Sequence, residues 1–126
     1  MAKRDLDQLL AVPVKSIDVG AKTDGTVNGA SADLKGYHSC IALVDADAWT
    51  DGIHVLSLED SPDDSTFTAV SGGASVTIDG AADDDQAYKI PYNGFERYVR
   101  VVCVTTTSTT GAIVGASLVR GHKALK

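Results

Sequence analysis

Few side chains in this sequence have the types and spacing that catalysis requires. None of the three histidines, His38, His54 and His122, has the spacing to another His or to a Cys that a zinc site uses. No serine nucleophile pattern, phosphate-binding loop or dinucleotide fingerprint occurs. His38 and His54 fall in strand-like runs, where a partly buried structural histidine is the expected role. The sequence therefore predicts no enzyme activity and no cofactor.

Acidic residues gather in two turn-like stretches and suggest calcium binding as an alternative. One group lies in residues 45–51 and the other in residues 60–64. Neither has the alternating oxygen ligands and distal Glu of an EF-hand, so solvated turns without a metal are expected. Glu59 and Asp60 are adjacent carboxylates, but neighbouring strand residues point to opposite faces and do not share a proton-transfer task.

Charge is unevenly distributed along the 126 residues, whose net charge is −6. Residues 1–35 are balanced, residues 36–88 carry eleven acids and no Lys or Arg, and residues 89–126 carry six basic residues and one acid. A nucleic-acid-binding protein normally presents a basic surface, so this class is disfavoured. The simplest role of the acidic middle segment is solubility, and the alternative is complementarity to partner surfaces in an assembly.

The chain has no membrane or secretion signal that we recognise. No apolar run approaches the ~20 residues of a membrane span. Asp5 and Asp7 occupy the place where a signal peptide is basic, so we expect synthesis in the cytoplasm. Cys40 and Cys103 lie in strand-like runs and are expected to be buried thiols, with a disulfide between them as the alternative.

Short apolar runs separated by turn residues predict an all-β fold. We expect residues 20–36 to form a loop with a short strand near residue 26, and residues 45–52 to form a turn. Trp49 in that turn is expected to plug the core, and a sugar-stacking platform is the alternative. The runs with strand character are 12–19, 37–44, 53–58, 67–70, 75–78, 86–90, 98–104 and 113–119.

About eight short strands at near-regular spacing predict an antiparallel β-sandwich, jelly-roll-like in arrangement. Residues 13–126 form this single domain, and residues 1–12 form an N-terminal arm. The apolar runs 98–104 and 113–119 are predicted to pair as a central hairpin of the sandwich. The threonine-rich bridge TTTSTTG, residues 105–111, is its expected exposed tip.

Two segments resemble a group of small structural proteins encoded by tailed bacteriophages. They are LEDSPDDSTFTAV, residues 58–70, and YNGFERYVRVVCVTTTSTTGAIVGASLVRG, residues 92–121. The shared features are an acidic Ser-Asp turn, a Phe-Thr strand, a Tyr-x-Gly turn, an Arg-Tyr-Val-Arg strand and a Thr-rich hairpin that ends in glycine. The matching residues are Ser61, Asp63, Asp64, Phe67, Thr68, Tyr92, Gly94, Arg97, Tyr98, Val99, Arg100 and Gly121.

The resemblance implies a virion component, often a decoration or cement protein on the capsid exterior. Its partners would be the major capsid protein and further copies of itself, as a homotrimer, with no nucleic acid and no membrane. It would be made in the cytoplasm of the host bacterium. A tail or head–tail connector protein and a glycan-binding module are the alternatives.

Three groups of residues are candidates for the interface of such a protein. The arm carries leucines that would be costly to leave in water, so we expect it to dock on another subunit, with folding back onto its own sandwich as the alternative. Arg100 shares a face with Tyr98 and Val102 and is predicted to be at least half covered and paired with an acid, either in residues 45–85 of its own chain or on a neighbouring subunit. The third group is the expected tip of the hairpin, residues 105–110. The candidates are Lys3, Arg4, Leu6, Leu9, Leu10, Arg100, Thr105, Thr106, Thr107, Ser108, Thr109 and Thr110.

Overall fold

A computed structural model of the chain describes residues 9–123, which form nine β-strands joined by turns. The strands are β1 (Val14–Lys22), β2 (Gly25–Asp33), β3 (Tyr37–Trp49), β4 (Ile53–Ser61), β5 (Thr68–Ala69), β6 (Ser75–Ile78), β7 (Gln86–Pro91), β8 (Tyr98–Thr106) and β9 (Ala112–Lys123).

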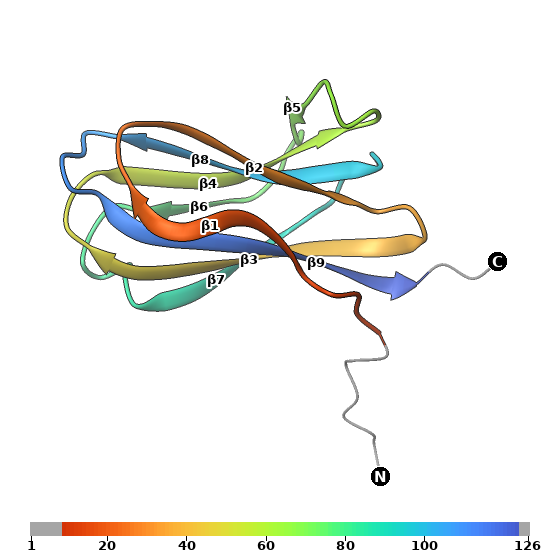
Figure 1. Ribbon diagram of the computed structural model, residues 1–126, viewed down its shortest axis with the longest axis horizontal. Coiled ribbons are helices and arrows are strands. Elements are labelled where there is room, and N and C mark those ends of the chain that lie inside the picture. The colour runs from red at the N-terminus through yellow and green to blue at the C-terminus, as the bar shows by residue number, and fades with distance from the viewer. Residues whose placement is uncertain (1–8, 124–126) are drawn as a thin grey trace, which may run out of the picture.

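The strands form two antiparallel sheets packed face to face, which confirms the predicted β-sandwich (Figure 1). One sheet has the order β1-β9-β3-β7. The other has the order β2-β8-β4-β5, and β6 pairs with β4. The turn between β1 and β2 lies at one end of the sandwich with the β3–β4 and β8–β9 connections (Figure 1). The β2–β3 and β7–β8 loops lie at the opposite end, where β1 begins and β9 ends.

The core fills the space between the sheets and follows the two-residue period of the strands. In β3, Ala42, Val44 and Ala46 are buried while the residues between them face outward. The core also contains large apolar side chains from both sheets, which are almost completely buried. These are Ile17, Leu56, Ile78, Ile90, Val99, Val101, Val114 and Leu118.

The predicted central hairpin is wrong, because β8 and β9 belong to different sheets. β8 lies between β2 and β4, and β9 lies between β1 and β3, so each is central in its own sheet. The connection between them crosses the sandwich as an arch. Gly111 has a φ of +86° there, and a Cβ at this position would overlap the carbonyl oxygen of Lys22. Only glycine therefore permits the crossing.

Two segments expected to be irregular are strands instead. Most of residues 20–36 completes β1 and forms β2, and residues 45–49 continue β3. β2 is largely exposed and made mostly of small residues, so its sequence lacks the alternation of large apolar residues that marks a strand. In β3 the buried member of the alternation is Ala46, whose small side chain gives a weak signal between two aspartates.

The hydroxyl of Ser16 joins the two sheets at one side of the sandwich. It donates a hydrogen bond to the carbonyl of Ala30 in β2 (2.8 Å) and accepts one from the N–H of Val101 in β8 (3.0 Å). The ladder between β2 and β8 is irregular at residues 28–31, so Val101 has no β2 residue opposite it. A Cβ at Gly29 would overlap the Ser16 hydroxyl and lie 2.6 Å from the Val101 carbonyl oxygen. The Ser16 hydroxyl therefore fits only because residue 29 has no side chain.

Ser16→Ala should lower the free energy of unfolding by about 1–3 kcal/mol, because it leaves the buried N–H of Val101 without an acceptor. Gly29→Ala should be at least as costly, since the added methyl group occupies the place of the hydroxyl. Urea denaturation followed by circular dichroism measures both. The control is Ser75→Ala, at an exposed position in β6, which should change stability by less than about 0.5 kcal/mol. Equal stability of all three variants would contradict a bridging role for Ser16.

Candidate protein–protein interface

Exposed large apolar side chains mark the surfaces of this protein that are suited to contact with other proteins. One group, Leu9, Leu10 and Val12, precedes β1. A second group, which includes Leu43, lies on the outer face of the β1-β9-β3-β7 sheet. A third group, Val27, Ile53 and Val104, lies on the other sheet, in β2, β4 and β8. Phe95 stands by itself in the loop between β7 and β8, and its side chain is 100% exposed.

The last residues of the arm pair with the end of β9. Leu10 forms a bridge with Gly121, the Ala11 N–H donates to the Arg120 carbonyl (2.9 Å), and the His122 N–H donates to the Leu9 carbonyl (3.2 Å). This part of the arm therefore lies on its own sandwich, while the Leu9 and Leu10 side chains remain exposed. Lys3, Arg4 and Leu6 lie outside the described residues.

Two aspartates hold the threonine-rich arch in one conformation. The Asp51 carboxylate accepts hydrogen bonds from the N–H groups of Gly111 (2.6 Å), Thr109 (3.0 Å) and Thr110 (3.1 Å). These bonds stabilise its charged form and lower its pKa, with that from Gly111 the largest cause. Asp24 accepts bonds from both the N–H and the hydroxyl of Ser108, each 2.8 Å long. The arch is thus a rigid surface feature.

Thr105 does not belong to the exposed tip, which corrects one of the predicted interface residues. Its side chain is 3% exposed and points into the sandwich. Its hydroxyl lies 2.9 Å from Nδ1 of the buried His54, whose Nε2 lies 3.0 Å from the Asp51 carbonyl. The period of β8 carries Thr105 inward with Cys103, so the tip consists of residues 106–110.

Arg100 is covered and paired, as predicted. Its side chain is 21% exposed, and its guanidinium contacts the Glu59 carboxylate at 2.6 Å on the outer face of the β4–β8 pair. The guanidinium also stacks over the ring of Phe67, 4.1 Å from the centroid. Arg97 pairs instead with Asp33 (2.8 Å) in a more open position, where its side chain is 45% exposed. The Arg97 hydrogen bonds are the main reason that the pKa of Asp33 falls to about 2.

Trp49 and the two cysteines belong to the packing of the sandwich. Trp49 packs against the core and its indole N–H donates to the Gly52 carbonyl (3.0 Å), so the ring is not presented as a free sugar-stacking platform. Cys40 and Cys103 are free buried thiols in opposite sheets. Burial raises the pKa of Cys40 to about 11.

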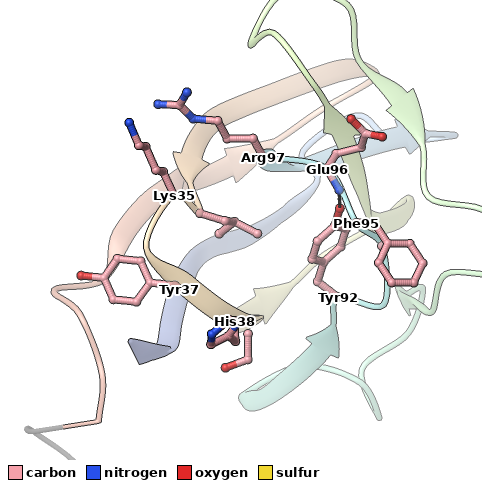
Figure 2. A pocket seen from close by; sticks show the side chains of 10 residues that line it. Lys35, Tyr37, His38, Tyr92, Phe95, Glu96 and Arg97 are labelled. Atoms are coloured by element: carbon pink, nitrogen blue, oxygen red, sulfur yellow. Dashed lines mark hydrogen bonds between the residues drawn. The ribbon is translucent and has the colours of Figure 1, made fainter. Parts of the chain in front are cut away.

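A groove of about 370 Å³ lies at the end of the sandwich that carries Phe95 (Figure 2). The β2–β3 loop and the start of β3 form one wall, with Lys35, Tyr37 and the exposed His38. The β7–β8 loop forms the other wall, with Tyr92 and Phe95 (Figure 2). The lining is aromatic with charged groups at the rim, a composition typical of surfaces that bind other proteins.

Two hydrogen bonds of the Tyr92 hydroxyl hold the β7–β8 loop in place. The hydroxyl of Tyr92 donates to the Asp60 carboxylate (2.8 Å) and accepts from the N–H of Glu96 (2.8 Å). Burial is the largest cause of the raised pKa of Tyr92, and the bond to Asp60 adds to it. A Cβ at Gly94 would lie 2.5 Å from the Tyr92 hydroxyl and 2.6 Å from Asp60, so glycine is required. Phe95 is therefore presented on a fixed loop.

Sequence reasoning identified Arg100 and the arch but missed Phe95 and the groove. The signal was an aromatic residue directly after the Tyr-Asn-Gly turn, where turn composition is otherwise polar. The structure does not bring the predicted candidates together: the arch lies at one end of the sandwich, and the arm residues 9–11 and the groove lie at the other (Figure 1).

Among the described residues, no group of three or more His, Cys, Asp or Glu side chains is placed to hold a metal ion. The same residues contain no helix long and apolar enough to span a membrane.

Comparison with known proteins shows similarity in fold. No protein-family model and no curated protein matches the sequence. Among solved structures, the chain is similar to a subunit of the disulfide-linked pili that form the endospore appendages of Bacillus. The two are 13% identical, the match covers 90% of this chain and 88% of the other, and the TM-score is 0.50. At this identity the likeness concerns the fold alone.

Asp51→Asn should lower the melting temperature at pH 7, because it removes the charge that the three N–H groups surround. The pKa of Asp51 is depressed in the folded protein, so its stabilisation is fully present above the ordinary carboxyl pKa and is lost as pH falls through the lower folded value. The difference in melting temperature between wild type and variant should therefore shrink below about pH 4. Scanning calorimetry of both proteins from about pH 2 to about pH 7 measures this difference in melting temperature. A difference independent of pH would contradict this role.

Arg100→Ala should destabilise the fold by about 1–3 kcal/mol, because it leaves Glu59 partly covered without its partner and exposes Phe67. Arg97→Ala is the matched control and should cost clearly less than Arg100→Ala, since its ion pair is open to solvent and screened by it. Urea denaturation of both variants gives the comparison. The assignment is wrong if the two changes have equal and small effects.

Proposed function

We propose that this chain is a non-enzymatic structural subunit of a tailed-phage virion, bound to the outer surface of the capsid as a decoration or cement protein. The observation that carries the proposal is a rigid β-sandwich that displays exposed apolar side chains, above all Phe95, on hydrogen-bonded loops. Such surfaces bury readily against partners at low entropic cost. An added interface that only the assembled shell provides stabilises that shell by mass action.

The segments that resemble phage structural proteins support this proposal through their contacts. Phe67 from the first segment covers Arg100 from the second. Tyr92 from the second segment bonds to Asp60 from the first. The resembling residues thus hold together the loops near the exposed Phe95, which is the part of the molecule that a partner would meet.

A subunit of a self-assembling appendage is the second candidate, and the fold similarity to pilus subunits favours it. The two candidates differ in what the purified chain does alone. An appendage subunit polymerises into fibres that negative-stain microscopy detects, whereas a decoration subunit remains in small species until capsids are added.

The direct test adds the purified chain to capsids that lack it. We expect saturable binding at hundreds of copies per capsid and a higher temperature of capsid disruption, whereas a connector would bind in about a dozen copies. Quantitative gel analysis of sedimented particles gives the copy number. A chain without residues 2–8 tests whether the arm contributes, and an arm that docks on the capsid predicts loss of binding with an unchanged melting temperature. Absence of binding by the full chain would refute the decoration role.

A further inference from the structure

The end of the sandwich that bears the groove carries both a projecting ring and a hollow. Phe95 stands at the rim with its side chain 100% exposed (Figure 2). An aromatic side chain of this kind buries about 150–250 Å² in a protein contact, so its exposure on the isolated chain is a large unused source of binding energy. The hollow beside it has aromatic walls formed by Tyr37 and Tyr92.

The ring is preorganised for insertion into a partner. The bonds from Tyr92 to Asp60 and from Glu96 to Tyr92 fix the loop on both sides of Phe95. Little backbone entropy is lost when such a loop is covered, and this favours association. A mobile loop would instead lose that freedom on binding.

The projection and the hollow are also complementary in charge. Glu96 follows Phe95 and is exposed beside the ring. Lys35 is exposed on the opposite wall of the groove (Figure 2). Within the part of the chain that the structure describes, neither side chain takes part in an ion pair. A ligand that brings an aromatic ring and an adjacent carboxylate therefore matches this groove, and the chain itself carries such a ligand.

We propose that two copies of this chain pair end to end, each inserting Phe95 into the groove of the other. The ring packs against Tyr37 and Tyr92 of the second copy, and the Glu96 carboxylate pairs with its Lys35. Because projection and hollow lie on the same end of the molecule, one two-fold rotation satisfies both contacts at once. This pairing does not depend on the capsid role and is measured on the purified chain without particles.

Sedimentation equilibrium over a wide concentration range tests the pairing. The wild type should shift from the mass of one chain to that of two as concentration rises. Phe95→Ala should raise the dissociation constant by about 100-fold, since the truncation occurs in both contacts. At concentrations where both proteins are single chains, its melting temperature should equal that of the wild type, because the removed ring is fully exposed and touches no core residue. Leu43→Ala removes an exposed apolar side chain from the outer face of the β1-β9-β3-β7 sheet, away from the groove. This control should leave the dissociation constant unchanged.

A charge exchange tests the partner directly. Lys35→Glu alone and Glu96→Lys alone should each prevent pairing, because two like charges then meet in both contacts. An equimolar mixture of these two variants should pair, since each contact again joins Glu to Lys. The double variant that carries both changes should pair with itself as well.

Several results would overturn the proposal. A wild type that remains a single chain at every concentration would do so, as would pairs that Phe95→Ala leaves intact. Pairing lost in Leu43→Ala would place the contact on the sheet face instead. A mixture of the charge variants that fails to pair would exclude the Glu96–Lys35 contact. If the wild type is monomeric and Phe95→Ala weakens only capsid binding, the ring is a contact to the particle and the self-pairing is wrong.

Discussion

One hydroxyl group determines how this sandwich closes along its β1–β2 side. Ser16 bonds to the backbone of β2 and of β8, and it replaces the ladder partner that Val101 lacks. The bridge requires that residue 29 have no side chain, because a Cβ there would overlap the Ser16 hydroxyl. The residue types at positions 16 and 29 therefore depend on each other. Because a buried N–H without an acceptor is costly, this contact keeps β1 of one sheet fixed against the other sheet.

Hydrogen bonds to aspartate carboxylates hold the loops at both ends of the sandwich. At one end the Asp51 carboxylate collects three backbone N–H groups of the arch, and at the other Tyr92 links Asp60 to the loop of Phe95. Carboxylates here fix backbone conformation. The result is a body with rigid ends, which suits assembly because fixed surfaces lose little entropy when they are covered.

The candidate interface was only partly readable in the sequence. The covered position of Arg100 followed from the alternation of β8, since its neighbours on that face are apolar. The same alternation turns Thr105 inward, but a continuous run of threonines concealed where the strand ends. Phe95 carried no periodic signal, and its importance rests on full exposure and on a loop that Tyr92 ties to Asp60 of β4. That contact joins positions more than thirty residues apart.

The sequence by itself determined the all-β class, one sandwich domain and most strand positions, because alternation of side chains is a local property of extended chain. It did not determine which strands share a sheet. A hairpin and an arch have the same pattern of two apolar strands and a polar bridge, so the separation of β8 from β9 was decided by tertiary hydrogen bonding. The polar strand β2 likewise exists through its ladder with β8. Most of the ladders here join segments distant in sequence, and no local pattern records which partner is chosen.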